Sequence, residues 1–220
     1  MTAKGAEKKD IKIAADDALI VVDLQPDFMP GGNLAVEGGN EIIEDINDLI
    51  PLFATVVGTQ DWHPAGHKSF ASAHDGKKPY DLFEEPGLGP VLWPDHCVRG
   101  TFGADFHPEV NVDDITLILR KGIHAGIDSY SVFMENDKKT ETGLSGYLKA
   151  RGVKRVFMCG LALDYCVFYS AMDGVNFGFE VFVIEDLTRP VDSPPGHLER
   201  AMNTMKDIGV EFIDKEAVSI

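Results

Sequence analysis

Apolar residues along the chain form two kinds of pattern that alternate with each other. Short continuous apolar runs, such as residues 18–23 (ALIVVD), are typical of strands buried on both faces of a sheet. Between these runs, apolar residues recur at intervals of three and four, as in residues 41–53, which predicts amphipathic helices. The predicted strands cover residues 18–23, 54–60, 114–121, 153–159, 180–184 and 210–213, and the predicted helices cover 41–53, 144–151, 165–175 and 197–208.

This alternation predicts the fold class. Strands that are separated by helices pair in parallel, and the helices cover both faces of the resulting sheet. We therefore expect an α/β protein with three α/β/α layers and a mainly parallel central sheet. A chain of 220 residues is long enough to bury the core of one such domain. We expect that domain over residues 17–220, preceded by a flexible polar arm over residues 1–16.

Charge and composition narrow the function classes. The chain has 36 Asp and Glu against 20 Lys and Arg, a net charge of −16, which argues against a nucleic-acid partner because phosphate binding needs clustered basic side chains. No apolar run reaches the roughly 18 residues of a membrane helix, and the N-terminus lacks the apolar centre of a signal peptide. We therefore expect a cytoplasmic protein without a membrane partner. The chain could also form a homo-oligomer, which the sequence does not decide.

The long segment 61–110 has no regular periodicity, and loops of this length are commonly functional. Asp61 and His63 lie two residues apart directly after a predicted strand, so that both side chains can face one ion. Carboxylate and imidazole suit zinc, iron or manganese. His96, in a proline-bounded segment, is a third candidate ligand. The competing interpretation is a surface loop with incidental histidines, since an Asp-x-His pair alone is common.

Three cysteines, an odd and small number, argue against a disulfide framework. Cys159 lies within a predicted strand and is expected in the core, whereas Cys97 follows a histidine and is ambiguous. Cys166 follows a strand and a glycine, with Asp164 as a candidate N-cap. It would then lie in the first turn of a helix, where free amides and the helix dipole favour a thiolate. The alternative is again a core cysteine.

Asp23 and Lys121 each end a predicted apolar strand. Taken singly, either side chain could simply face solvent. The carboxyl ends of parallel strands meet at one edge of the sheet, where such folds hold their sites. If the two strands are neighbours, Asp23, Lys121 and Cys166 supply a base, a cation and a nucleophile at one place.

Taken together, six segments resemble the nicotinamidase/pyrazinamidase group of the isochorismatase-like cysteine hydrolases. They are DLQPDFMPGG, TQDWHPAGHKSF, LWPDHCVRGT, LRKG, DSYSVF and GLALDYCV, and their order and spacing agree with that family. The resemblance implies the isochorismatase-like hydrolase fold. It also implies a metal-dependent amidohydrolase that deaminates nicotinamide to nicotinate and ammonia in NAD salvage, with pyrazinamide as a further expected substrate.

The resemblance also implies roles for single residues. It implies a catalytic triad of Asp23, Lys121 and Cys166, and one divalent ion held by Asp61, His63 and His96. Zinc is expected first, with iron or manganese as alternatives, and His67 is expected outside the first coordination shell. The backbone amides of Ala162 and Cys166 would form the oxyanion hole after a cis peptide bond between Leu161 and Ala162. Phe28 and Trp93 would hold the substrate ring between them.

Two other hypotheses remain at this point. The chain could be a related isochorismatase-like amidase that acts on another small amide, although the Asp61, His63 and His96 set argues against the isochorismatase branch itself. It could also be a non-catalytic metal-binding protein on the same fold, which the joint presence of Asp23, Lys121 and Cys166 argues against. A thiol redox role lacks the expected C-x-x-C pair.

Overall fold

The computed structural model describes residues 10–220, and its centre is a six-stranded sheet. The strands follow the order β4-β3-β2-β5-β6-β7, and every neighbouring pair is parallel. Their bounds are β2 Asp17–Val22, β3 Thr55–Asp61, β4 Leu117–Lys121, β5 Arg155–Leu161, β6 Glu180–Arg189 and β7 Glu211–Ile213. The prediction of a mainly parallel sheet is therefore confirmed.

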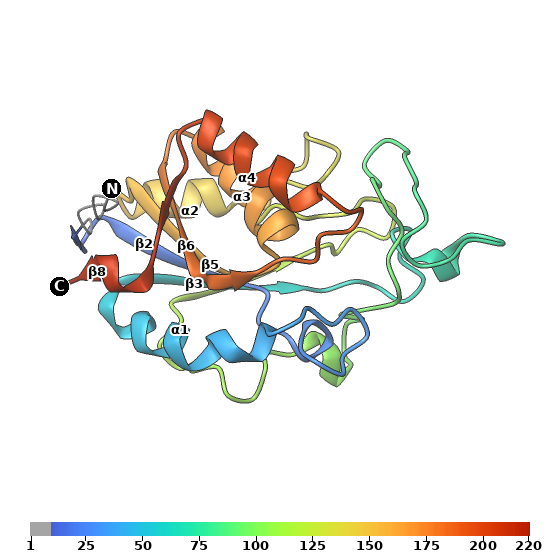
Figure 1. Ribbon diagram of the computed structural model, residues 1–220, viewed down its shortest axis with the longest axis horizontal. Coiled ribbons are helices and arrows are strands. Elements are labelled where there is room, and N and C mark those ends of the chain that lie inside the picture. Colours follow the sequence, from blue (N-terminus) through green and yellow to red (C-terminus); the bar gives the residue numbers. More distant parts are fainter. Residues whose placement is uncertain (1–9) are drawn as a thin grey trace, which may run out of the picture.

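Helices cover both faces of this sheet (Figure 1). One face carries α1 (Ile43–Leu49), whose Ile43, Ile46 and Leu49 are buried, as its apolar spacing predicts. The other face carries three helices, α2 (Leu144–Ala150), α3 (Phe168–Asn176) and α4 (His197–Asp207). The molecule thus has the three α/β/α layers that the sequence predicts.

Burial along the strands follows their place in the sheet. All six residues of β2, at the centre, are buried, because helices cover both of its faces. In β4, at the edge, burial alternates until the buried Lys121, and Ile118 is 49% exposed. Within residues 10–220 no helix is both long and apolar enough to cross a membrane.

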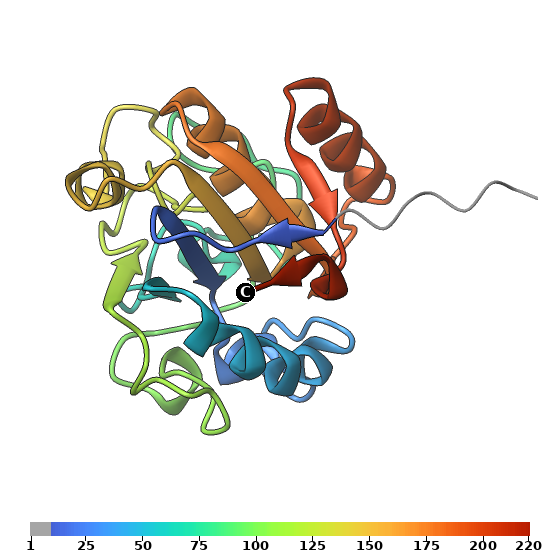
Figure 2. The same ribbon diagram turned by 90° about the vertical axis from the view of Figure 1, so that its left-hand side faces the viewer.

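The two ends of the described chain meet in a second, smaller sheet (Figure 2). Strand β1 (Ile11–Lys12) pairs in parallel with β8 (Val218–Ser219), and the Ile11 side chain is buried in the core. This part of the arm expected over residues 1–16 therefore packs against the domain. The remainder of that expected arm, residues 1–9, lies outside the described residues.

Several predicted boundaries differ from the observed ones. Strand β6 is ten residues long and ends at Arg189, beyond the predicted residue 184. The predicted helix 165–175 is instead a π-helical turn, η6 (Leu163–Val167), followed by α3. The predicted helix 41–53 is α-helical only over α1, with the 3₁₀ turns η2 (Gly39–Ile42) and η3 (Ile50–Leu52) at its two ends. Four further 3₁₀ turns lie where no helix is predicted: η1 Pro26–Phe28, η4 Ala71–Ala73, η5 Phe102–Ala104 and η7 Lys215–Ala217.

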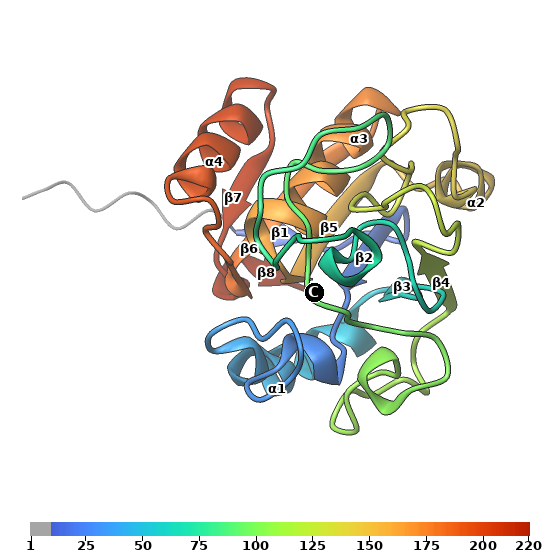
Figure 3. The ribbon, with the colours of Figure 1, turned by 90° about the vertical axis from the view of Figure 1, so that its right-hand side faces the viewer.

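From β2 the chain adds strands toward one edge of the sheet (β3, β4), and from β5 it adds them toward the other edge (β6, β7), so that the topological switch point lies between β2 and β5. In open parallel sheets ligands bind at this switch point, beyond the carboxyl ends of the strands. Here β5 approaches β2 very closely at Gly160, whose φ is +105° and whose hypothetical Cβ would lie 2.1 Å from the carbonyl oxygen of Val22. Only glycine fits between the two backbones. The long segment between β3 and β4 runs across this end of the sheet (Figure 3).

Candidate active site

Four adjacent strands deliver four chemically active side chains to one place. Asp61 and Lys121 are the last residues of β3 and β4, and the strand register sets them directly opposite each other. Asp23 follows β2, and Cys166 lies in η6 just after β5. The structure therefore brings Asp23, Lys121 and Cys166 together, because their strands are neighbours in the sheet.

The ammonium of Lys121 is at the centre of this group. Its Nζ lies 2.9 Å from Asp23 Oδ2 and 3.4 Å from Cys166 Sγ, donates to the carbonyl oxygen of Ser129 at 3.0 Å, and contacts Asp61 Oδ1. Burial favours a neutral amine, but the carboxylates of Asp23 and Asp61 outweigh it and raise the pKa of Lys121 well above its ordinary value. The side chain stays charged.

Asp23 and Cys166 form a base and acid pair beside this ammonium. Burial raises the pKa of the Cys166 thiol well above its ordinary value, although Lys121 acts in the opposite direction. Burial likewise raises the pKa of Asp23. Thr59 Oγ1 donates to Asp23 Oδ1 at 2.6 Å, which holds the carboxylate in place. One carboxylate oxygen of Asp23, one of Asp61 and Cys166 Sγ all lie within 4.8 Å of one another.

Two local expectations about Cys166 are wrong. Asp164 is no N-cap, because its carboxylate instead accepts hydrogen bonds from the backbone N–H groups of Val191 and Asp192. The thiol does not lie in the first turn of an α-helix, because Cys166 belongs to η6 and α3 begins at Phe168, and burial raises its pKa. A base must therefore remove its proton. The Leu161–Ala162 peptide bond before this turn is cis, as the resemblance implies.

A second cluster, beside the first, has the donor set of a metal site. Asp61, His63 and His96 each offer a ligand atom within 4.8 Å of the others. Nε2 of His63 and Nε2 of His96 lie 3.7 and 3.8 Å from Asp61 Oδ2. Burial favours the neutral acid, but Lys121 and the imidazoles outweigh it and hold the pKa of Asp61 well below its usual range.

The backbone orients both imidazoles toward this cluster. Nδ1 of His63 lies 3.0 Å from the carbonyl oxygen of Gly122, and Nδ1 of His96 lies 2.8 Å from that of Pro94. A proton on each Nδ1 leaves the lone pair of Nε2 free, which is the arrangement typical of metal-binding histidines. Gly122 has a φ of +66°, and a Cβ there would lie 2.4 Å from Cε1 of His63. The three residues therefore fit one divalent ion.

His67 lies close to this cluster but has no free ring nitrogen. Its Nε2 faces the carbonyl oxygens of His124 and Ile127 at 2.9 and 3.1 Å and must carry the proton. Its Nδ1 then accepts from Ser69 Oγ at 2.7 Å. The ring packs against His63 at a centroid distance of 4.4 Å. This arrangement agrees with a position outside the first coordination shell.

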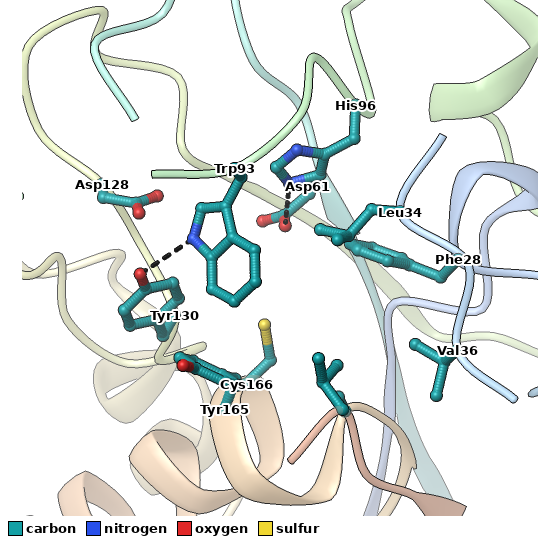
Figure 4. Close-up of a pocket in the computed structure, with 12 residues that line it drawn as sticks. Phe28, Leu34, Val36, Asp61, Trp93, His96, Asp128, Tyr130, Tyr165 and Cys166 are labelled. Atoms are coloured by element: carbon teal, nitrogen blue, oxygen red, sulfur yellow. Dashed lines mark hydrogen bonds and ion pairs between the residues drawn. The ribbon is translucent and has the colours of Figure 1, made fainter. Parts of the chain in front are cut away.

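The two clusters border one pocket (Figure 4). Phe28 and Trp93 line it, the sulfur of Cys166 points into it, and Asp61 and His96 line it as well. Trp93 is fixed by its Nε1–H, which donates to Tyr130 Oη at 3.0 Å. The other lining residues are Leu34, Val36, Asp128, Tyr130, Ala162, Tyr165 and Val191.

Sequence reasoning assigned no role to several of these residues. Asp128 and Tyr130 lie in the DSYSVF segment, which carried part of the resemblance, but no periodicity indicated that they face the pocket. Thr59 is an ordinary strand residue in sequence, and only strand pairing brings it to Asp23. The one available signal was the polar pair Asp128–Ser129 shortly after a strand end.

The comparisons with known proteins agree with this geometry. The isochorismatase domain model matches residues 17–217. The nicotinamidase of Acinetobacter baylyi is 48% identical over 210 residues, covering 96% of this chain and 98% of the relative. A solved nicotinamidase/pyrazinamidase of Acinetobacter baumanii has a TM-score of 0.90 at 50% identity, covering 92% of this chain and 98% of the other.

Two further solved structures carry ligands. A protein from L. infantum in complex with nicotinate has a TM-score of 0.84 at 37% identity, covering 96% of this chain and 98% of the other. A pyrazinamidase of Pyrococcus horikoshii in complex with zinc has a TM-score of 0.72 at 36% identity, covering 90% and 99%. The chain belongs to the isochorismatase domain family, within the group of the nicotinamidases and pyrazinamidases.

Proposed function

We propose that this protein is a nicotinamidase, which hydrolyses the carboxamide of nicotinamide to nicotinate and ammonia for NAD salvage and also accepts pyrazinamide. The observation that carries the proposal is the position of Lys121 Nζ, 2.9 Å from Asp23 Oδ2 and 3.4 Å from Cys166 Sγ, beside a pocket that Cys166, Asp61 and His96 line. The similarity to known nicotinamidases supports the same activity.

In the proposed reaction Asp23 removes the thiol proton of Cys166, and the sulfur attacks the carboxamide carbon. The N–H groups of Ala162 and Cys166 stabilise the oxyanion. Lys121 offsets the negative charge that passes between Asp23 and Cys166. Asp23 then gives its proton to the departing ammonia. Water, deprotonated by Asp23, hydrolyses the thioester and releases nicotinate and the free thiol.

The ring of the substrate would lie between Phe28 and Trp93, which stack on flat rings of any kind. Asp61, His63 and His96 would hold one divalent ion. Such an ion would supply a Lewis-acidic site for the ring nitrogen, and binding there would orient the carboxamide toward Cys166. We propose zinc, which the Pyrococcus horikoshii relative binds, with iron or manganese as the alternatives.

Ammonia release from a series of ring amides tests this function. Nicotinamide and pyrazinamide both carry a ring nitrogen meta to the carboxamide and should be hydrolysed efficiently. Picolinamide has its nitrogen in the wrong position, and benzamide has none. Both should lose at least about tenfold in kcat/KM, the equivalent of about 1.4 kcal/mol of transition-state stabilisation.

Two results would count against the proposal. Benzamide hydrolysis at the rate of nicotinamide would show that no ion orients the ring and would favour a general small-amide hydrolase. No ammonia from any of the four amides, in a folded and metal-loaded protein, would favour a non-catalytic metal-binding protein.

A further inference from the structure

Asp128 is a buried carboxyl group that the proposed reaction does not use. Its side chain lines the pocket and the residue is only 2% exposed. Its Oδ2 has no hydrogen-bond partner among residues 10–220, and no Lys, Arg or His of those residues forms an ion pair with it. Burying a carboxyl oxygen without a partner is costly.

The backbone fixes the direction in which this oxygen points. Asp128 Oδ1 accepts from the N–H of Ser129 at 2.9 Å. The N–H of Asp128 donates to the carbonyl oxygen of Gly87, and its own carbonyl oxygen accepts from Asn136, both at 2.8 Å. With one oxygen and the backbone held in this way, Oδ2 is left without a partner, and the side chain lines the same pocket as Asp61 and His96 (Figure 4).

The surroundings of Asp128 exclude two simple roles. It lies within 4.8 Å of ring nitrogens of His63 and His67, but these three do not make a second metal site, because both nitrogens of His67 are already used. Nor does it belong with the nucleophile: among the described residues no hydrogen bond or ion pair joins its side chain to Asp23, Lys121 or Cys166. Asp128 instead belongs to the metal end of the pocket.

The charge balance of the proposed metal site suggests a role for the carboxyl group of Asp128. Asp23 and Asp61 are offset in part by Lys121, so a divalent ion bound by Asp61, His63 and His96 would leave one positive charge uncompensated. The side chain of Asp128, which has a carboxylate oxygen within 4.8 Å of a ring nitrogen of His63, would balance that charge. Carboxylates that hydrogen-bond to the ligands of an ion commonly set its affinity and the orientation of its shell.

We infer that Asp128 is a positioning residue of the metal site, whose Oδ2 accepts a hydrogen bond from a water molecule that completes the shell of the ion. This inference rests on the metal site of the proposed function. Through that water Asp128 raises the affinity for the ion and fixes the direction from which a pyridine ring approaches it.

Metal affinity, measured without substrate, tests the inference. Apoprotein is titrated with zinc against a chromophoric chelator for wild type, Asp128→Asn and Asp128→Ala. The Asn variant keeps the bond to Ser129 but loses the charge, so zinc affinity should fall by about 10- to 100-fold. Asp113→Asn makes the same charge change at an exposed position and should bind zinc as the wild type does.

A stability readout separates this role from a purely structural one. Because Oδ2 has no partner in the protein itself, Asp128→Asn should leave the melting temperature of the apoprotein unchanged or higher, while zinc stabilises it less than it stabilises wild type. Zinc affinity equal to wild type in both Asp128 variants would overturn the inference. Equal affinity combined with a raised KM for nicotinamide would show that Asp128 contacts the substrate instead, and would also overturn it.

The failure of the proposed function has a different signature. If the wild-type apoprotein binds neither zinc, iron nor manganese, the metal site fails, and Asp128 fails with it. If wild type binds the ion and the Asp128 variants bind it equally well, only the positioning role is lost.

Discussion

At the scale of single residues, the same side-chain type takes different roles according to its neighbours. Cys159 and Cys166 are both buried cysteines whose pKa is raised by burial. Cys159 lies within β5, where its thiol donates to the carbonyl oxygen of Ile20 at 3.9 Å. Cys166 lies beside Lys121 and lines the pocket. Position alone therefore separates a core residue from a nucleophile.

This contrast gives a paired prediction. Cys166→Ala should lose nicotinamide hydrolysis to the background of the ammonia-release assay, because no other thiol lines the pocket among the described residues. Cys159→Ala should stay active within a few fold and lose about 1 kcal/mol of unfolding free energy, the cost of a small core truncation. Zinc content and circular dichroism should be unchanged in both. Appreciable hydrolysis by purified Cys166→Ala would refute its assignment as the nucleophile.

The sequence indicates the reactive residues of the site better than the residues that hold them in position. Asp23, Lys121 and Cys166 each sit at or just beyond a strand end, where a polar residue after an apolar run is conspicuous. Thr59 and Tyr130 reach their partners only through strand pairing and loop packing. Nothing local in the sequence distinguishes such residues from ordinary strand or loop positions.

At the scale of elements, the turn after β4 determines where one metal ligand can lie. Gly122 has a φ of +66°, and its hypothetical Cβ overlaps the ring of His63. Gly122→Ala should therefore push the imidazole out of the cluster, lower zinc content at least tenfold and lower activity in parallel. Elemental analysis of the purified protein measures the first effect.

A matched glycine separates crowding from backbone strain. Gly76 has a similar φ of +73°, but a Cβ there meets nothing within 4 Å. Gly76→Ala should cost about 1 kcal/mol of stability through the left-handed backbone and leave zinc content intact. Equal zinc loss in both variants would mean that strain, rather than contact with His63, governs the site.

Elements with strong periodicity were predicted correctly, and irregular ones were not. The continuous apolar run of β2 and the helical spacing in α1 are visible in the sequence, because each reflects how a regular element is buried. The π-helical turn η6 shows neither pattern, because its five residues include the polar Asp164 although all of them are buried. Strand β6 continues past residue 184 through the polar residues Glu185 and Asp186, which appeared to end it.

At the scale of the whole molecule, the segment between β3 and β4 is held by the site that it helps to build. Asp61 and His63 lie at the start of this segment, and His96 lies far along it. Backbone contacts already hold the two parts together, since the N–H of His63 donates to Cys97 and that of Arg99 donates to His63. An ion bound by all three side chains would add a further link across the same loop.

Removing that ion should therefore lower the stability of the whole domain without unfolding it. At a zinc concentration about 100 times the dissociation constant, binding contributes about 2.7 kcal/mol, which corresponds to about 5–10 °C in melting temperature for a chain of this size. Scanning calorimetry of the apoprotein with and without zinc measures the shift. His96→Ala should abolish most of it, because one of three ligands is lost, whereas His74→Ala, a histidine of the same segment outside the metal cluster, should keep it. The same shift in His96→Ala as in wild type would mean that the ion binds elsewhere, and the orientation of the substrate ring would then need another explanation.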